Sequence, residues 1–184
     1  SRFVKSIYCL AQDKTLAESV DVKYLDRNPI NNADSMSLNQ ILMHSLQLIE
    51  SQGDFPDSIL YVNYDYIHRP EGIFNKLIPD AQYKGCDTLF PGLIDYGHYW
   101  YHNEEQVYMQ TDPSLKPREN REPLYKALYG QGCVSAAWII RKGQMLGGKV
   151  GILKLSDSKY IFNMTPNINI INTYPKISSR FIYI

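Results

Sequence analysis

The feature that most constrains the fold of this chain is a short apolar run that ends abruptly in polar residues. Residues 59–62, Ile-Leu-Tyr-Val, have the composition of a strand that is buried on both faces. Four polar side chains follow within seven residues: Asn63, Asp65, His68 and Arg69. In an open α/β sheet, ligands bind outside the carboxyl ends of the strands. We therefore expect a functional site here, although an ordinary strand-to-helix turn has the same pattern.

The first half of the chain alternates between predicted strands and helices. Strands at 4–10 and 22–25 flank a short helix at 14–19, which is the β-α-β pattern of a parallel sheet with a right-handed crossover. A longer helix follows, because its apolar residues recur every three or four positions and Ser37 and Gln40 have the spacing of a capping box. Those apolar residues are Leu38, Ile41, Leu42, Leu46 and Ile49.

The second half of the chain repeats this alternation less regularly. A helix begins after Pro70 and is expected to close at Pro79, and a buried strand at 88–90 is expected to end at Pro91. Residues 95–125, rich in aromatic side chains, are predicted to form an antiparallel excursion or an interface. The last strands are predicted at 136–140, 150–155, 160–162 and 168–171. The predicted fold is a single α/β domain over 1–184, with three α/β/α layers and a mostly parallel central sheet.

Composition and charge narrow the range of partners. The formal net charge is zero, which argues against nucleic acid or an anionic membrane as the main partner. No apolar run reaches the roughly 18 residues that a membrane span requires. The three cysteines are far apart in apolar surroundings, which favours reduced thiols over a disulfide frame or a zinc site. We therefore expect a cytoplasmic protein.

Charged and amide side chains recur at the predicted strand ends. Arginine in such loops suits carboxylate or phosphate ligands, because its planar fork donates paired hydrogen bonds. The glycines at 130 and 132 would let the backbone approach a ligand closely. The candidate binding residues are Asp13, Arg27, Asn63, Arg69, Arg118, Arg121 and Gln131, and Asp65 is the candidate metal ligand.

The order of these motifs resembles that of the acylneuraminate cytidylyltransferase (CMP-sialic acid synthetase) family. The resemblance covers nearly the whole chain through short motifs, at 11–13 (Ala-Gln-Asp), 24–27 (Tyr-Leu-Asp-Arg), 34–35, 62–69, 118–125 and 131–132. It implies a fold like that of nucleotide-diphospho-sugar transferases, a homodimer, and transfer of a nucleotidyl group from CTP to an acidic sugar with Mg²⁺. By the same resemblance Arg27 and Asn63 would contact the nucleotide or sugar, Arg118 or Arg121 would hold the sugar carboxylate, and Gln131 would hydrogen-bond the sugar.

Two departures from the family pattern bear on activity. The family opens with a phosphate-cradling loop rich in glycine and lysine, which this chain lacks, so we expect upstream residues to be missing. The family also ends in an aspartate-rich metal site, where residues 167–173 here carry asparagines. The resemblance therefore implies an incomplete catalytic site in the chain as given.

Two other functions fit the same residues. One is a non-catalytic module that binds a nucleotide-sugar or assembles with a partner. The other is a glycosyltransferase of similar architecture that uses Asp65 with Mn²⁺. Among the histidines, His68 is a candidate phosphate contact, His44 is expected to be structural, and His98 and His102 are expected to pack or to meet a second subunit.

Overall fold

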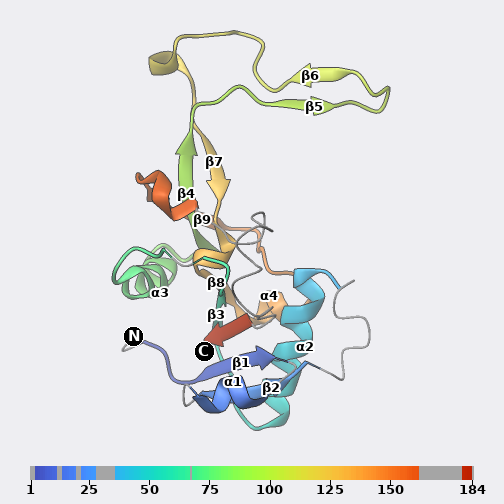
Figure 1. Cartoon of the computed structure of the whole chain (residues 1–184), viewed down its shortest axis with the longest axis vertical. Coiled ribbons are helices and arrows are strands. Elements are labelled where there is room, and N and C mark those ends of the chain that lie inside the picture. The colour runs from blue at the N-terminus through green and yellow to red at the C-terminus, as the bar shows by residue number, and fades with distance from the viewer. Residues whose placement is uncertain are drawn as a thin grey trace.

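The computed structural model describes residues 3–11, 14–19, 22–27, 36–66, 68–161 and 180–183. Within these ranges one large sheet has the strand order β2-β1-β10-β3-β8-β4-β7, and β9 pairs with β4 outside this path (Figure 1). The strands are β1 (Ile7–Ala11), β2 (Lys23–Asp26), β3 (Ser58–Asn63), β4 (Thr88–Asp95), β7 (Leu124–Ala127), β8 (Cys133–Ala136), β9 (Val150–Leu155) and β10 (Arg180–Tyr183). The helices are α1 (Lys14–Ser19), α2 (Leu38–Ser51), α3 (Ile73–Tyr83) and α4 (Ala137–Arg141).

The predicted three-layer α/β/α fold with a mostly parallel sheet is wrong. Five of the seven strand pairings described in the large sheet are antiparallel, and only β1–β2 and β4–β9 are parallel. The reason is that β10 lies between β1 and β3, and β8 lies between β3 and β4, each running against its neighbours. Apolar runs show where strands form but carry no information on which strands become neighbours.

The insertion of β10 and β8 leaves one directional feature intact. Strand β10 is antiparallel to both β1 and β3, and β8 is antiparallel to both β3 and β4, so β1, β3 and β4 run in the same direction. Strand β2 is parallel to β1 and shares this direction. Their carboxyl ends therefore lie at one edge of the sheet, which we call the carboxyl edge. This is the edge at which the sequence places Arg27, Asn63 and Arg69.

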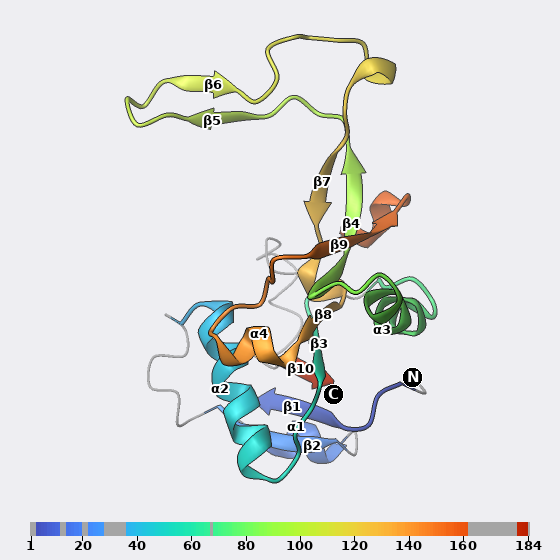
Figure 2. The same ribbon diagram turned by 180° about the vertical axis from the view of Figure 1, so that it is seen from behind.

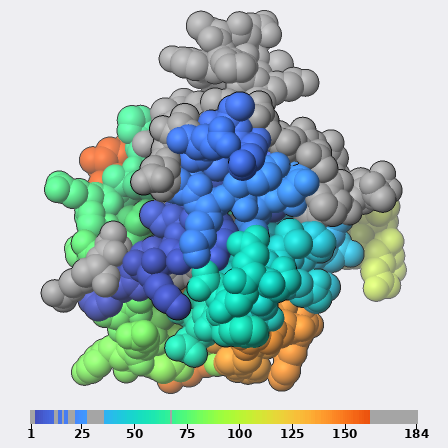
Figure 3. Space-filling model, turned by 90° about the horizontal axis from the view of Figure 1, so that it is seen from below, coloured from blue at the N-terminus to red at the C-terminus, as the bar shows by residue number. Residues whose placement is uncertain are grey.

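The core occupies both faces of the sheet, as expected for a strand like β3. Ile59 and Tyr61 belong to the cluster that packs against α2 and α4, whereas Leu60 and Val62 pack against α3. Figures 1 and 2 show α3 on one side of the sheet and α2 with α4 on the other. In the view from below (Figure 3), α2 in teal lies beside the orange segment that contains α4.

Helix α2 confirms the prediction made from its sequence. The Ser37 side chain accepts a hydrogen bond from the Gln40 backbone nitrogen, and the Gln40 side chain accepts one from the Ser37 nitrogen, which completes the capping box. The buried residues Ile41, Leu42 and Leu46 form the expected apolar stripe, together with Ile49.

Several predictions for the second half are wrong. Pro79 lies inside α3 and does not end it. Strand β4 continues through residues 91–92 to Asp95, because Gly92 leaves room for β9: a Cβ at this position would meet Ile152 Cγ2 at 2.6 Å. Residues 137–141 form α4 and not a strand, since a short buried apolar run fits either structure by its pattern alone.

The segment predicted to form an antiparallel excursion or an interface contains an antiparallel hairpin and extends away from the sheet. Between β4 and β7 the chain forms a hairpin of β5 (Trp100–His102) and β6 (Tyr108–Gln110), followed by the 3₁₀ helix η1 (Arg118–Asn120). Figures 1 and 2 show this segment projecting from the end of the β4–β7 ribbon. We call residues 96–122 the arm. No helix in the described part of the chain is long and apolar enough to cross a lipid bilayer.

Candidate functional site

The backbone register brings several of the predicted site residues to the carboxyl edge. Asn63 is the last residue of β3 and pairs with Arg180 of β10, which in turn pairs with Leu10 of β1. On the other side of β1, Ala11 pairs with Asp26, and the backbone nitrogen of Arg27 donates to the Ala11 carbonyl at 3.1 Å. Arg27 and Asn63 therefore lie at the same edge, three strand spacings or about 14 Å apart.

The turn after β3 is held by its own polar side chains. Asn63 Oδ1 accepts from the Asp65 backbone nitrogen at 3.1 Å, and Asn63 Nδ2 donates to Asp65 Oδ2 at 3.1 Å. Arg69 Nη2 donates to the Asn63 carbonyl and, at 3.4 Å, to the Gly130 carbonyl. The guanidinium thus joins the turn after β3 to the segment that precedes β8. This cluster of Asn63, Asp65 and Arg69 is partly buried.

Gly130 lies where a side chain could not fit. A Cβ at this position would meet Tyr66 Cδ2 at 2.6 Å and Asn63 Cβ at 2.9 Å. The glycine therefore has a close-approach role, as the sequence predicts, but what approaches is the protein's own turn. It belongs to the 3₁₀ helix η2 (Tyr129–Gln131), which leads directly into β8.

Gln131 is fully buried at this edge and acts as a clamp. Its Nε2 donates to the backbone carbonyls of His68 and Tyr160, both at 2.7 Å. Tyr160 lies in the 3₁₀ helix η3 (Ser158–Ile161), in a region for which the sequence predicts a strand. Because the amide nitrogen is fully used, only Gln131 Oε1 remains for a ligand, and this buried oxygen has no hydrogen-bond partner within the described residues.

Of the remaining predicted residues, Arg27 lies at the same edge but is buried, with 6% of its surface exposed. Arg118 and Arg121 belong to the arm, where Arg118 stacks at 5.3 Å over the ring of Tyr96 and Arg121 Nη1 donates to the Tyr96 carbonyl at 2.7 Å. The structure therefore does not bring these two arginines to the turn after β3. Asp13 and the segment at 167–173 lie outside the described residues.

Asp65 is the predicted metal ligand, and its surroundings fit only a metal ion whose other ligands are substrate phosphates and water. Within the described ranges no three histidine, cysteine, aspartate or glutamate side chains gather around a common point. Mg²⁺ is commonly held by one or two carboxylates together with substrate phosphates and water. Asp65 would supply one carboxylate to such an ion, and the Asn63 amide already orients it.

The histidines have mostly local contacts. His68 is exposed beside the turn after β3. In the arm, His98 Nδ1 lies 3.0 Å from Gln110 Nε2, and the His102 ring lies 4.1 Å from that of Tyr108. His44 is partly buried in α2, and its Nε2 has no hydrogen-bond partner among the residues that the structure describes.

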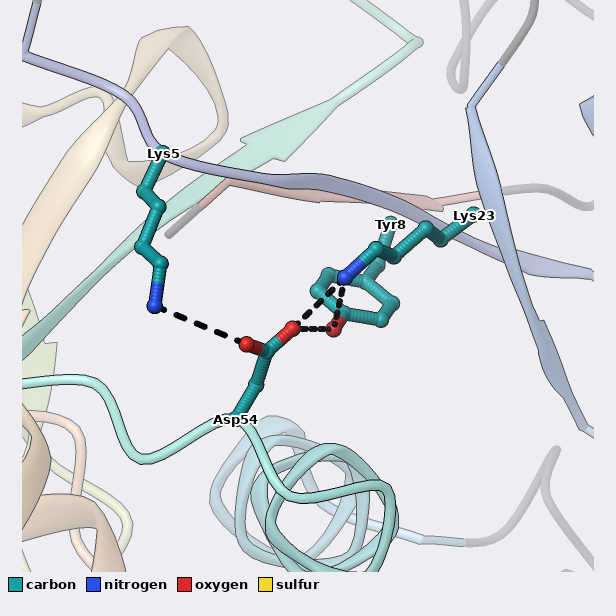
Figure 4. Close-up of polar contacts among 4 residues, drawn as sticks. All are labelled: Lys5, Tyr8, Lys23 and Asp54. Carbon is teal, nitrogen blue, oxygen red and sulfur yellow. Dashed lines mark hydrogen bonds and ion pairs between the residues drawn. The ribbon is translucent and has the colours of Figure 1, made fainter.

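A second polar cluster, which the sequence did not reveal, lies near the amino ends of β1, β2 and β3. Figure 4 shows its four members, Lys5, Tyr8, Lys23 and Asp54. The Tyr8 hydroxyl donates to Asp54 Oδ2, and Lys23 Nζ donates to the same oxygen at 2.6 Å and to the Tyr8 hydroxyl at 3.2 Å. Lys5 Nζ lies 3.7 Å from Asp54 Oδ1. The parallel register that pairs Tyr8 with Lys23 would have been a usable signal, but Asp54 comes from the loop after α2.

The pKa values of this second cluster indicate a structural role. The hydrogen bonds from Lys23 and Tyr8 lower the pKa of Asp54 to about 2. Burial and the Asp54 contact raise the pKa of Tyr8, and the Asp54 hydrogen bond raises that of Lys23. All three groups therefore keep one protonation state around neutral pH, which suits a fixed ion pair and not proton transfer.

The comparisons with known proteins leave the family open. The sequence matches no protein-family model, and a search of curated proteins gave no significant match.

Proposed function

We propose that this chain is a binding domain for a nucleotide or nucleotide-sugar together with an acidic sugar, with its site at the carboxyl edge. The observation that carries the proposal is the common direction of β1, β2 and β3, which brings Arg27, Asn63 and Arg69 to one edge. The proposal rests on these residues and not on a parallel fold.

The chemistry of the edge suits an extended anion. Arg27 follows β2 and Arg69 follows the turn after β3, so the two arginines would contact two separate anionic groups, such as a phosphate and a sugar carboxylate. The planar fork of a guanidinium matches either group; Arg69 is partly buried and Arg27 is 6% exposed. Gln131 is fully buried, so its Oε1, which has no partner among the described residues, lies beneath this edge and not on the surface that would meet the sugar.

The reaction that such a site would serve is cytidylyl transfer. A hydroxyl oxygen of the acidic sugar forms a bond to the α-phosphorus of CTP, the bond to the pyrophosphate oxygen breaks, and pyrophosphate leaves. Arg69 would offset negative charge on the phosphates, and the hydroxyl proton passes to solvent. When Mg²⁺ is bound with the triphosphate, Asp65 would be its protein ligand, and the ion would supply positive charge for the leaving group.

Isothermal titration with CTP, CMP, CMP-sialic acid, sialic acid and neutral glucose tests the binding claim. We expect saturable binding of the anions only, and a 10- to 150-fold loss in Arg69→Ala, from about 1.5–3 kcal/mol for hydrogen bonds to a charged group. Arg141→Ala is the matched control, because it removes an arginine of α4 that does not belong to the candidate site and forms a 2.8 Å ion pair with Glu50 of α2. Equal affinity in wild type and Arg69→Ala, with circular dichroism unchanged, would remove the proposed site.

Activity assays distinguish the two enzymatic functions from a non-catalytic binding function. Pyrophosphate release from CTP with an acidic sugar and Mg²⁺ would support a cytidylyltransferase. Hydrolysis of a nucleotide-sugar with Mn²⁺, without consumption of CTP, would support a glycosyltransferase. Binding without either reaction would leave the non-catalytic module.

The arm supports a second candidate function, assembly into a homodimer. Trp100 and Tyr101 are adjacent in β5 and both more than half exposed, so neither face of the hairpin is covered by the residues that the structure describes. An isolated two-stranded hairpin is only marginally stable in water. Other large apolar or aromatic side chains of the arm are also exposed, at Tyr99, Val107, Tyr108, Met109 and Leu115.

Charge favours a second copy as the partner of the arm. Glu104 and Glu105 lie at the tip of the hairpin, whereas the end of the arm that returns to β7 has three cations, Lys116, Arg118 and Arg121, against two anions, Glu119 and Glu122. In a two-fold arrangement of antiparallel arms, the acidic tip of one arm would lie against the basic end of the other.

Light scattering coupled to size exclusion tests this assembly. We expect a dimer that Trp100→Ala weakens at least tenfold, since buried aromatic residues dominate interface energies. Trp138→Ala is the matched control, because Trp138 has a similar exposure of 46% but lies in α4 beside Lys142. A monomeric wild-type protein at high micromolar concentration would refute the dimer.

A further inference from the structure

A cavity of about 320 Å³ lies at the edge of the sheet opposite the candidate site. It is bounded by the residues that lead into β1, by the loop between α2 and β3, and by the last turns of α3. Its volume falls within the range of sites for small molecules. The side chains that decide its chemistry are Phe3, Lys5, Phe55, Asp57, Ile78 and Gln82.

The apolar wall of this cavity is incompletely covered. Phe55 is 73% exposed and Phe3 is 39% exposed, although large aromatic side chains usually bury most of their surface in a protein. Ile78 behind them is almost fully buried and closes the cavity toward the core. An aromatic ring in the cavity would cover Phe55 and Phe3 from solvent.

Three charged side chains line the cavity: Lys5, Asp54 and Asp57. Asp54 is already matched by Lys23, whose Nζ lies 2.6 Å from its Oδ2, and Lys5 approaches the other oxygen only to 3.7 Å. Figure 4 shows the two lysines reaching Asp54 from different sides. Two lysines against one carboxylate leave a surplus positive charge, and the Lys5 side chain is 83% exposed. Asp57, also exposed, brings a negative charge to the same cavity.

We infer that this cavity binds a small zwitterion with an aromatic ring, of the chemistry of a free aromatic amino acid. The ligand carboxylate pairs with Lys5, its ammonium pairs with Asp57, and its ring lies against Phe55 and Phe3. The inference is independent of the proposed function, because the carboxyl edge contributes no residue to this cavity.

Titration of the full chain with phenylalanine and three analogues tests each part of the inference. Alanine lacks the ring, phenethylamine lacks the carboxylate, and 3-phenylpropionate lacks the ammonium. We expect saturable binding of phenylalanine and at least fivefold weaker binding of each analogue. Absence of saturable binding of phenylalanine at millimolar concentration would overturn the inference, and so would equal affinity for phenethylamine.

Variants assign the contacts to residues. Phe55→Ala is expected to abolish binding, and Lys5→Ala to weaken phenylalanine at least fivefold without changing phenethylamine. Tyr83→Ala is the matched control for the ring, because Tyr83 is 92% exposed on α3 and does not line the cavity. Lys14→Ala is the control for the charge, since Lys14 pairs with Glu18 on α1. Binding that survives Phe55→Ala would exclude this cavity as the site.

Discussion

Replacing Gln131 with alanine should loosen the carboxyl edge more than any surface substitution. Gln131 Nε2 joins two separate segments, since it donates to the carbonyl of His68 in the turn after β3 and to that of Tyr160 in η3. Both bonds measure 2.7 Å, and the glutamine is fully buried. Arg69 follows His68 directly, so the clamp also fixes the backbone that carries the proposed anion contact.

The expected magnitude follows from counting the groups left behind. Each lost bond leaves a carbonyl without its donor, at about 1–3 kcal/mol when the carbonyl is buried. The His68 carbonyl belongs to an exposed residue, so water can replace part of its lost hydrogen bond. Removing Gln131 also removes the buried, unpartnered Oε1, which reduces the loss of stability by about 1 kcal/mol. A net loss of about 1–3 kcal/mol remains, which corresponds to about 2–12 °C in Tm for a chain of this size.

Urea unfolding followed by circular dichroism would measure this loss. Gln131→Glu should cost more than Gln131→Ala, because it places a carboxylate against two carbonyl oxygens. Gln47→Ala serves as the control, since Gln47 is exposed on α2 and alanine is the better helix former. If Gln131→Ala stayed within about 0.5 kcal/mol of wild type, the range of ordinary surface substitutions, the clamp described above would be refuted.

Three further substitutions test other parts of the structure. Gly130→Ala should cost about 1–3 kcal/mol by overpacking against Tyr66, while Gly148→Ala, whose nearest neighbour is 3.8 Å away, should be near neutral in the same urea assay. Asp54 has a pKa lowered to about 2, so the stability that its ion pair contributes is present above about pH 4 and is lost as the pH falls toward 2. In Asp54→Asn the urea midpoint should vary less over this pH window than in wild type. The same pH dependence in both proteins would contradict the ion pair. Leu77→Ala, at a fully buried site, should cost about 2–5 kcal/mol in thermal unfolding, and a loss below 1 kcal/mol would mean that α3 packs loosely.

Local elements were predictable where the signal lies within one segment. The capping box of α2 and its apolar stripe depend on residues three and four apart, and β9 was predicted with its observed bounds, Val150–Leu155. The position of Asn63 and Arg69 after a strand buried on both faces was also predictable. Backbone hydrogen bonding and side-chain periodicity fix these features over short distances.

The candidate site was predictable only in part. The sequence placed Asn63, Asp65 and Arg69 together because they follow one strand, and it placed Gln131 beside a turn. It did not show that Arg118 and Arg121 stabilise the arm, where their contacts are with Tyr96 and with the Lys116 carbonyl. The Asp54 cluster was missed because its members come from β1, β2 and the loop after α2.

The sequence by itself determined that β3 is buried on both faces and that polar side chains follow it, because both facts are written in consecutive residues. The tertiary structure alone decided the order and direction of the strands. β10 pairs with β1 and β3 across more than a hundred residues of chain, and β8 separates β3 from β4. Such pairings depend on which strand edges meet after hydrophobic collapse of the chain, and a pattern of apolar residues does not specify which edges these are.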